Sequence, residues 1–254
     1  MSSELARQQM VEQQIRTWDV FDADILRTFK AVPRDRFVPK DCADVAYADT
    51  EMPLAHGQCM LRPSIVGRLL QALAPQATDD VLEIGTGTGY LTACLANLAH
   101  SVTSIDIHDD FIATATKNLS DAGVDNVSLE CMDVMSELPD GMFDVIAMTC
   151  AVPEYHDAYT DLLKPGGRLL ILEFSKPGNP LLSKVYDAYS FKALPFFGKL
   201  ITGDAESYRY LAESIRMHPD QETLKQMMLD AGFSQARYHN MTGGVVALHR
   251  GVKA

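Results

Sequence analysis

One short stretch constrains the fold of this chain more than any other. Residues 81–92 read Val-Leu-Glu-Ile-Gly-Thr-Gly-Thr-Gly-Tyr-Leu-Thr. An apolar, β-branched run ends here in three alternating glycines, and a segment of helical character follows at once. A strand, a glycine turn and a helix in this order bring bare backbone N–H groups up to a ligand. Glycine leaves room for that approach and tolerates positive φ. The stretch therefore predicts an α/β fold with a ligand at the end of this strand.

The spacing of the glycines narrows the class of ligand. Gly85, Gly87 and Gly89 form G-x-G-x-G, whereas dinucleotide folds use G-x-G-x-x-G and phosphate loops carry a lysine. Glu83 precedes the loop, and its charge would repel a diphosphate but suit a cationic amine or sulfonium. Asp106 ends the next apolar run, 17 residues after Gly89, where a carboxylate can hold a ribose diol. The combination resembles motif I and its acidic partner in class I S-adenosylmethionine (SAM)-dependent methyltransferases; the alternative is a plain tight turn.

Composition limits the partners that we expect. The net charge is 22 − 34 = −12, so the surface repels phosphates and a nucleic-acid substrate is not expected. The 254 residues suffice for one large domain or two small ones. We read no signal peptide at the start and find no apolar run of the roughly 18 residues that span a bilayer.

Cysteine and histidine usage bounds the compartment and the metal chemistry. The five cysteines are scattered and form no C-x-x-C pair, which is typical of a reducing cytosol, and we expect a cytoplasmic protein. The seven histidines include no H-x-x-x-H pair, so the spacing predicts no metal site.

Hydrophobic periodicity predicts alternating strands and helices from residue 80 onward. Before them, residues 4–30 look helical from their apolar spacing, and a helix is expected over 63–73. We expect strands at 80–84, 101–107, 127–132, 143–149 and 168–174, and helices at 90–99, 109–122, 154–163 and 219–231. Two last runs, 233–239 and 244–250, predict a terminal antiparallel hairpin. The pattern predicts a doubly wound, mostly parallel seven-stranded sheet that resembles the Rossmann-like methyltransferase fold.

We expect one methyltransferase domain over 1–254. Within it we expect an N-terminal helical lid over 1–75, a SAM-binding core over 76–174, a substrate-cap insert over 175–218, and a last helix with the hairpin over 219–254.

The N-terminal two-thirds, about residues 8–165, resembles the protein-L-isoaspartate O-methyltransferase family. The matching pieces are residues 32–39, 47–54, 56–58 and the glycine motif. After His-Gly-Gln that family carries Thr-Ile-Ser, whose serine is its implicated active-site residue. This chain has Cys59-Met60-Leu61 instead, and leucine neither donates nor accepts a hydrogen bond.

The C-terminal third, about residues 165–253, resembles the ubiquinone/menaquinone biosynthesis C-methyltransferases. The match runs through residues 167–177, 186–191, 207–221 and 244–251. That family carries Leu-Arg-Asn after its fourth strand, where this chain has Ala151-Val-Pro-Glu154, and its early Tyr-Asp-x-Met-Asn segment has no counterpart here. The chain therefore resembles a mosaic whose join falls near residues 163–168, a segment that both families share.

Both resemblances imply SAM as the cofactor and place it on the same residues. The glycine loop leaves room for the methionine moiety and Glu83 lies near its amino group, with Thr88 beside the turn. Asp106 accepts from the ribose hydroxyls and Ile107 lies on the adenine face. The implied cofactor-binding residues are Glu83, Gly85, Gly87, Thr88, Gly89, Asp106, Ile107, Asp133, Val134 and Thr149. The alternative for Asp106 and Asp133, each taken alone, is a simple strand-end cap.

Aromatic residues concentrate in the 175–218 insert, where they predict either a lid helix packed on the sheet or a pocket for a flat ring with an apolar tail. The resemblance favours a cap over a small-molecule, lipid-tailed quinol, which implies transient contact with a membrane surface; the oligomeric state stays open. The substrate candidates are Tyr186, Tyr189, Tyr208 and Arg216.

The function predicted first is C-methylation of a prenylated quinol by a SAM-dependent methyltransferase. Ring methylation also removes a ring proton, for which the candidate bases are His218, Glu154, His156 and His56. Two alternatives stay open at this point. One is an isoaspartyl carboxyl O-methyltransferase, and the other is a SAM-binding protein without turnover.

Overall fold

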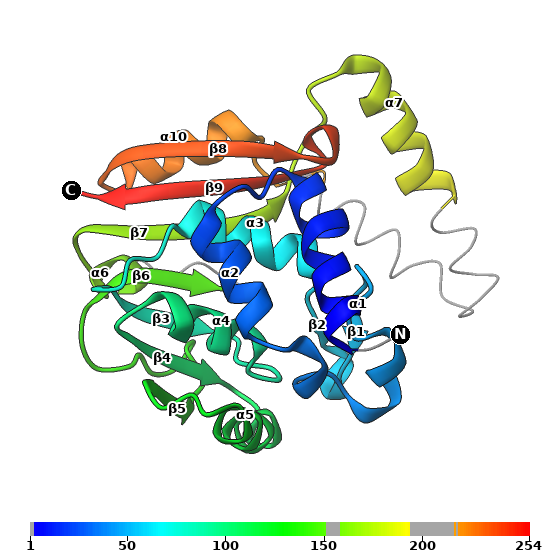
Figure 1. Cartoon of the computed structure of the whole chain (residues 1–254). Coiled ribbons are helices and arrows are strands. Elements are labelled where there is room, and N and C mark those ends of the chain that lie inside the picture. The colour runs from blue at the N-terminus through cyan, green and yellow to red at the C-terminus, as the bar shows by residue number, and fades with distance from the viewer. Residues whose placement is uncertain (1–2, 151–157, 194–215, 217) are drawn as a thin grey trace. The chain divides into compact units, whose positions relative to one another are not determined.

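The computed structural model describes residues 3–150, 158–193, 216 and 218–254 (Figure 1). Its α-helices are α1 (Ser3–Gln9), α2 (Ala23–Ala31), α3 (Pro63–Leu73), α4 (Tyr90–Leu98), α5 (Asp109–Ala122), α6 (Ala158–Asp161), α7 (Pro180–Ala188) and α10 (Gln221–Asp230). Shorter π and 3-10 helices are η1 (Met10–Ile15), η2 (Arg16–Trp18), η3 (Arg34–Arg36), η4 (Lys40–Val45), η5 (Ala55–Gly57), η6 (Tyr189–Ala193) and η7 (Thr242–Gly244). Within these ranges, no helix has the length and apolar character needed to cross a membrane.

The strands form one large sheet and one small hairpin. They are β1 (Met52–Pro53), β2 (Cys59–Met60), β3 (Asp80–Ile84), β4 (Ser101–Asp106), β5 (Val127–Cys131), β6 (Phe143–Met148), β7 (Leu163–Phe174), β8 (Phe233–Met241) and β9 (Val246–Lys253). The seven-stranded sheet has the order β5-β4-β3-β6-β7-β9-β8, with parallel pairing from β5 to β7. The arrows of β8 and β9 point in opposite directions (Figure 1). The predicted doubly wound, mostly parallel sheet with a terminal hairpin is confirmed.

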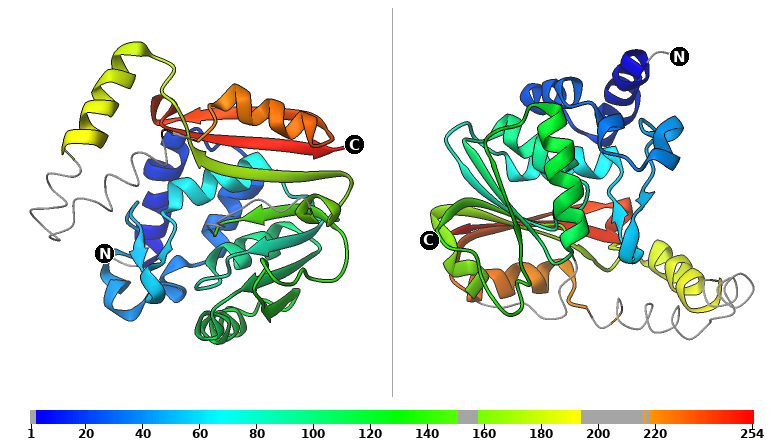
Figure 2. Two further views of the ribbon diagram at one scale, coloured as in Figure 1. Left: turned by 180° about the vertical axis from the view of Figure 1, so that it is seen from behind. Right: turned by 90° about the horizontal axis from the view of Figure 1, so that it is seen from below.

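The chain consists of two compact units, residues 1–170 with 253 and residues 171–252 with 254. In the second unit, α10 packs along β8 (Figure 2). A Cβ on Gly251 of β9 would come within 2.7 Å of Met228 and Phe233, so a glycine is needed where helix and strand approach this closely. The expected boundaries of lid, core and cap remain predictions.

The centre of the first unit is a strand buried on both faces. Val81, Leu82, Glu83 and Ile84 of β3 are all buried, as expected for a strand between two parallel neighbours. The order of strands reverses beside β3, since β4 leads to β5 on one side and β6 to β7 on the other. Open α/β sheets bind ligands at the carboxyl ends of strands at such a switch point.

The N-terminal region, which looks helical over 4–30 from its sequence, is divided into separate helices. The helical path ends at η2, where Asp19 adopts a left-handed backbone with φ of 59°. Asp22 then caps α2, because its side chain accepts hydrogen bonds from the N–H groups of Asp24 and Ile25. α2 packs against α3 and α4. A cap and a left-handed residue are local features that apolar spacing does not reveal.

Two further boundaries differ from the prediction. β7 begins at Leu163 rather than at residue 168, and the Pro-Gly-Gly segment forms an irregularity within the strand, where the register against β6 shifts. Of the helix predicted over 154–163, α6 covers Ala158–Asp161, and residues 151–157 lie outside the described part. Ahead of the large sheet, β1 pairs with β2 across η5 to form a small hairpin.

Candidate active site

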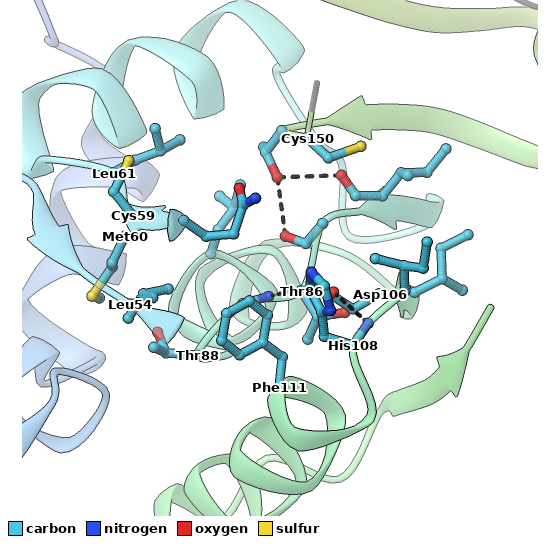
Figure 3. A pocket seen from close by; sticks show the side chains of 18 of the residues that line it. Leu54, Cys59, Met60, Leu61, Thr86, Thr88, Asp106, His108, Phe111 and Cys150 are labelled. Atoms are coloured by element: carbon cyan, nitrogen blue, oxygen red, sulfur yellow. Dashed lines mark hydrogen bonds between the residues drawn. The ribbon is translucent and has the colours of Figure 1, made fainter. Parts of the chain in front are cut away.

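A cavity of about 410 Å³ opens at the carboxyl ends of β3, β4 and β6 (Figure 3). The glycine loop and the residues that follow these strands form one side of it. The opposite side comes from the β1–η5–β2 segment, residues 52–60, and the adjoining Leu61, which we call the hairpin side. The volume lies in the range of pockets that enclose small organic ligands.

The glycine loop lies tight against the ends of β4 and β6. The Gly85 N–H donates to the carbonyl of Ile105 at 2.8 Å. A Cβ on Gly85 would be 2.7 Å from Oγ1 of Thr149, which is too close. The φ of Gly85 is +109°, a backbone conformation that residues with a side chain rarely adopt, so glycine is required for both reasons. The Thr149 hydroxyl in turn donates to the Gly85 carbonyl at 3.0 Å. The loop and the end of β6 therefore hold each other in place.

The three glycines have different surroundings. Gly87, with φ of +52°, lines the cavity, and the nearest atom to an added Cβ is Cδ1 of Leu54 at 3.7 Å. Gly89, with φ of +83°, faces α5 instead, where its Cβ would lie 3.1 Å from that of Ala115. Gly89 does not line the cavity. It allows α4 and α5 to pack closely where the loop enters α4.

Asp106 joins the glycine loop to the end of β4. Its Oδ2 accepts the N–H of Gly87 at 2.9 Å and its Oδ1 accepts the N–H of His108 at 3.1 Å. The residue is 9 % exposed and lines the cavity. A carboxylate has about four acceptor positions, so two remain for hydroxyl groups of a ligand. This placement fits the ribose role that the resemblance implies.

Glu83 lies beneath the loop rather than in the cavity wall. It is fully buried and accepts hydrogen bonds from the hydroxyls of Thr92 and Ser104, the latter at 2.6 Å. Burial raises the pKa of Glu83 to about 7, against the lowering effect of these two hydrogen bonds. Because the Ser104 proton points to Glu83, the Thr86 hydroxyl donates to Ser104 at 2.7 Å. Glu83 therefore supports the loop from below through this network.

The residues predicted to hold the adenine line the cavity together. Ile107, Asp133 and Val134 all contribute to it, as do Thr88 and Thr149 from the predicted cofactor set. Oδ1 of Asp133 accepts the N–H of Met135 at 2.9 Å, which fixes the carboxylate at the start of the loop after β5. Their roles toward the cofactor remain predictions.

Several lining residues were missed from the sequence. Thr86, Tyr90, His108 and Phe111 line the cavity, and Tyr90 directly follows the last glycine, a position that could have drawn attention to it. The Tyr90 ring packs against Phe37, with centroids 5.6 Å apart, and the fully buried Arg34 guanidinium lies 5.0 Å from its centroid. The proline-bracketed segment 32–39 thus anchors the N-terminal region at the start of α4.

The hairpin side of the cavity is uncharged. It contributes Leu54, Gln58, Cys59, Met60 and Leu61. Burial, together with the nearby Glu51 carboxylate, raises the pKa of the Cys59 thiol. Cys150, after β6, has a pKa raised by burial to about 11. At neutral pH both sulfurs are thus protonated and poorly nucleophilic, which suits a site that handles an electrophilic methyl group.

The candidate bases are scattered. His56 does not line the cavity; its ring stacks on that of His108 and its Nε2 lies 3.0 Å from Oδ1 of Asp110. His218 belongs to the second unit, with its Nδ1 3.0 Å from the carbonyl oxygen of Pro219. Glu154 and His156 lie outside the described residues.

The substrate candidates in the second unit gather in part. Tyr186 and Arg216 line a small cavity of about 60 Å³, where Arg216 pairs with Asp187 at 3.0 Å and stacks over Phe191 at 5.6 Å. Tyr189 is half exposed and does not line this cavity. Tyr208 lies outside the described residues. The same holds for residues 194–215 and 217, which make up about half of the expected cap over 175–218.

Known structures share this architecture. The chain is similar to a protein-L-isoaspartate O-methyltransferase with a TM-score of 0.58 and 24% identity, over 65% of this chain and 54% of that one. It is also similar to a Plasmodium falciparum protein-L-isoaspartate O-methyltransferase in complex with S-adenosyl-L-homocysteine, with a TM-score of 0.56 and 22% identity, over 65% and 83% of the two chains. At these identities the likeness establishes the fold.

Relatives in sequence are much closer. The model of the ubiE/COQ5 methyltransferase family matches residues 65–253, so the match begins well upstream of residue 165, where the motifs first suggested it. The ubiquinone/menaquinone biosynthesis C-methyltransferase UbiE of Ectopseudomonas mendocina is 55% identical over 184 residues, 68% of this chain and 72% of that protein. UbiE of Teredinibacter turnerae is 53% identical over 187 residues, 69% and 75% of the two chains. The chain therefore belongs to the ubiE/COQ5 methyltransferase family and is a SAM-dependent methyltransferase.

Proposed function

We propose that this methyltransferase transfers the methyl group of SAM to a ring carbon of a prenylated quinol in ubiquinone and menaquinone biosynthesis. The observation that carries the proposal is 55% identity, over 68% of this chain, to a C-methyltransferase named for that pathway. The match to the family model covers residues 65–253 and so includes the C-terminal third, in which the sequence motifs resemble the same family.

The chemistry of the cavity supports the same acceptor. Leu54, Met60 and Leu61 form an apolar wall opposite the strand ends, which suits a flat ring better than an aspartyl carboxylate. Against Leu54, Met60 and Leu61 the carboxylate of an isoaspartyl acceptor would find no hydrogen-bond donor, since the side-chain donors on this side of the cavity are confined to Gln58 and Cys59, and burial of an unpaired charge is costly.

We assign the cofactor-binding roles as part of this proposal. Asp106 receives the ribose hydroxyls, Ile107 covers one face of the adenine, and Asp133 with the Val134 amide receives the adenine amino group. The open cradle at Gly87 takes the methionine moiety. When bound, SAM supplies a methyl group that is electrophilic because of its sulfonium charge. The chain aligns the acceptor with that group and keeps water away.

We further propose that the acceptor reaches the site by transient contact with a membrane surface, because its prenyl tail is apolar. The protein itself we place in the cytoplasm, since all five cysteines are unpaired thiols, as in a reducing compartment. Tyr186 and Arg216 are the described candidates for contact with the substrate tail or ring.

An acceptor panel with methyl-labelled SAM tests the proposal. We expect label in the quinone fraction when the demethylated prenylated quinol is supplied and background label on an isoaspartyl peptide. Label on the peptide with none on the quinol would contradict the proposal and identify the activity as carboxyl methylation. Binding of SAM without label on either acceptor would contradict both activities.

A further inference from the structure

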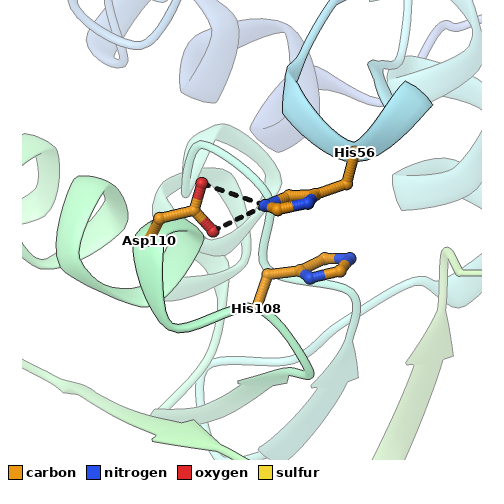
Figure 4. A group of neighbouring side chains, drawn as sticks. All are labelled: His56, His108 and Asp110. Atoms are coloured by element: carbon orange, nitrogen blue, oxygen red, sulfur yellow. Dashed lines mark hydrogen bonds and ion pairs between the residues drawn. The ribbon is translucent and has the colours of Figure 1, made fainter.

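Two histidines and an aspartate meet at the rim of the cofactor cavity (Figure 4). The rings of His56 and His108 stack with centroids 3.8 Å apart and planes at 6°. Nε2 of His56 lies 3.0 Å from Oδ1 of Asp110. The Phe111 ring stands edge-on to both imidazoles, at 5.4 and 5.3 Å. Each of the three polar residues offers a ligand atom, and these atoms all lie within 4.8 Å of one another.

The cluster joins two segments that are distant in sequence. His56 lies on η5, between β1 and β2, and has a left-handed backbone with φ of 57°. His108 occupies the position just before α5, and Asp110 lies in the first turn of that helix, 54 residues after His56. The side chains of His56 and Asp110 are 42% and 51% exposed, so both can turn without displacing the core.

We propose that His56, His108 and Asp110 form a binding site for a divalent transition-metal ion of the zinc class, which fastens the β1–β2 hairpin to the start of α5. Two imidazoles and one carboxylate are the ligand set that zinc accepts in open sites, where water takes the fourth position. The same set suits cobalt and nickel.

The geometry requires a limited rearrangement. Tetrahedral zinc with bonds of about 2.0–2.1 Å holds its ligand atoms roughly 3.3 Å apart. The ligand atoms must therefore draw together from separations of up to 4.8 Å. The nitrogen lone pairs of two stacked rings lie in parallel planes, so one ring must also turn before both can point at one ion. We expect the His56 ring to turn, because His56 is exposed whereas His108 is partly buried.

The site adjoins the cofactor cavity without being part of the glycine loop. His108 lines the cavity, and its backbone N–H donates to Asp106 at 3.1 Å. A metal held by His108 and His56 would therefore restrain the hairpin that forms the opposite wall. This inference does not depend on which acceptor is methylated.

Titration of the full-length, tag-free chain with zinc chloride against a chelating dye tests the site. We expect one zinc ion per chain at micromolar affinity. His108→Asn and Asp110→Asn should each weaken binding about tenfold or more. Asp109→Asn is the matched control, because it removes the same charge from the neighbouring, exposed aspartate outside the cluster, and it should leave the affinity unchanged. Equal effects of the two aspartate variants, or no binding, would overturn the site.

Two further measurements separate the cluster from other ligands. Cys59 and Cys131 are exposed thiols that could also bind zinc. Cobalt bound at the cluster should show ligand-field bands without a thiolate charge-transfer band, whereas such a band would assign the ion to cysteine. Zinc should also slow amide hydrogen exchange in residues 52–60 of the wild type and leave it unchanged in Asp110→Asn. Unchanged exchange in the wild type would contradict the fastening of the hairpin.

Discussion

The two sides of the cavity are built in different ways. The side that we propose to hold the cofactor, here called the cofactor side, consists of strand ends and a glycine loop. It is held by hydrogen bonds such as that from the Gly87 N–H to the Asp106 carboxylate, and it lies within the family match. The hairpin side consists of uncharged side chains on residues 54–61, apolar apart from the Gln58 amide and the Cys59 thiol, and it precedes the match, which begins at residue 65. A cofactor site fixed by hydrogen bonds at the strand ends can thus be combined with a wall that comes from outside the family match. The cofactor side should therefore govern SAM binding, and the hairpin side the choice of acceptor.

Among the variants considered, Asp106→Asn should have the largest effect, and it should act on SAM binding at the cofactor side. Asp106 now accepts hydrogen bonds from two backbone N–H groups. In the variant the amide NH2 group would face one of these N–H groups, donor against donor, and the proposed hydrogen bonds to the ribose would weaken. We expect SAM to bind about 100-fold more weakly, or roughly 3 kcal/mol, by calorimetry.

Asp109→Asn serves as the matched control for this variant, since it removes the same charge from an exposed position three residues away. Its SAM affinity should equal that of the wild type. A change below threefold in a folded Asp106→Asn protein would contradict the cofactor role of that carboxylate.

Glu83 should give the cofactor side a distinct dependence of stability on pH. Its pKa is raised from 4.5 to about 7 in the folded chain, so folding favours the protonated form. The stabilisation is complete below pH 4.5 and is lost as the pH rises through 7. On this basis the free energy of unfolding should fall by on the order of 3 kcal/mol over that range.

Glu83→Gln should remove this fall, because the amide oxygen can still accept from Thr92 and Ser104 and does not titrate. Urea unfolding at pH 5 and pH 8, followed by the fluorescence of the single Trp18, measures the difference in the first unit. The free energy of unfolding of the variant should rise relative to that of the wild type as the pH increases. Parallel profiles of the two proteins would show that Glu83 is already ionised in the folded state.

Leu61→Asp should have the smallest effect and the most selective one. A charge on the apolar wall should raise the KM for the quinol about tenfold, or roughly 1.4 kcal/mol, while the affinity for SAM changes less than about twofold. Leu61→Met, which keeps volume and polarity, should behave as wild type. A loss of SAM affinity equal to the loss for the quinol would mean that the two sides of the cavity are not independent.

Much of the cofactor side could be predicted from the sequence, because its signals are local. Alternating glycines after a buried strand specify a turn, and Asp106 lies at the end of the next strand in both sequence and structure. Glu83 was harder to interpret. Its charge pointed to a ligand, whereas the structure buries it on hydroxyls 9 and 21 residues away, and no local pattern announces such partners.

The N-terminal region was predicted less well. Apolar spacing indicates helical structure over 4–30 without showing where it breaks, whereas the structure divides it at the left-handed Asp19 and the Asp22 cap. The short β1–β2 pairing likewise involves two residues in each strand, too few for an alternating pattern to register.

The cofactor could be inferred from the sequence alone, because the alternating glycines form a local backbone turn and Asp106 and Asp133 lie at or just after the ends of the next two strands. Tertiary structure alone decided which side chains face that loop. Leu54 and Leu61 reach the cavity, and His56 meets His108 and Asp110, only because the β1–β2 hairpin lies across the carboxyl ends of the strands. Contacts between residues more than 50 positions apart in the sequence depend on how the sheet and the N-terminal region pack. Local sequence spacing does not predict that packing.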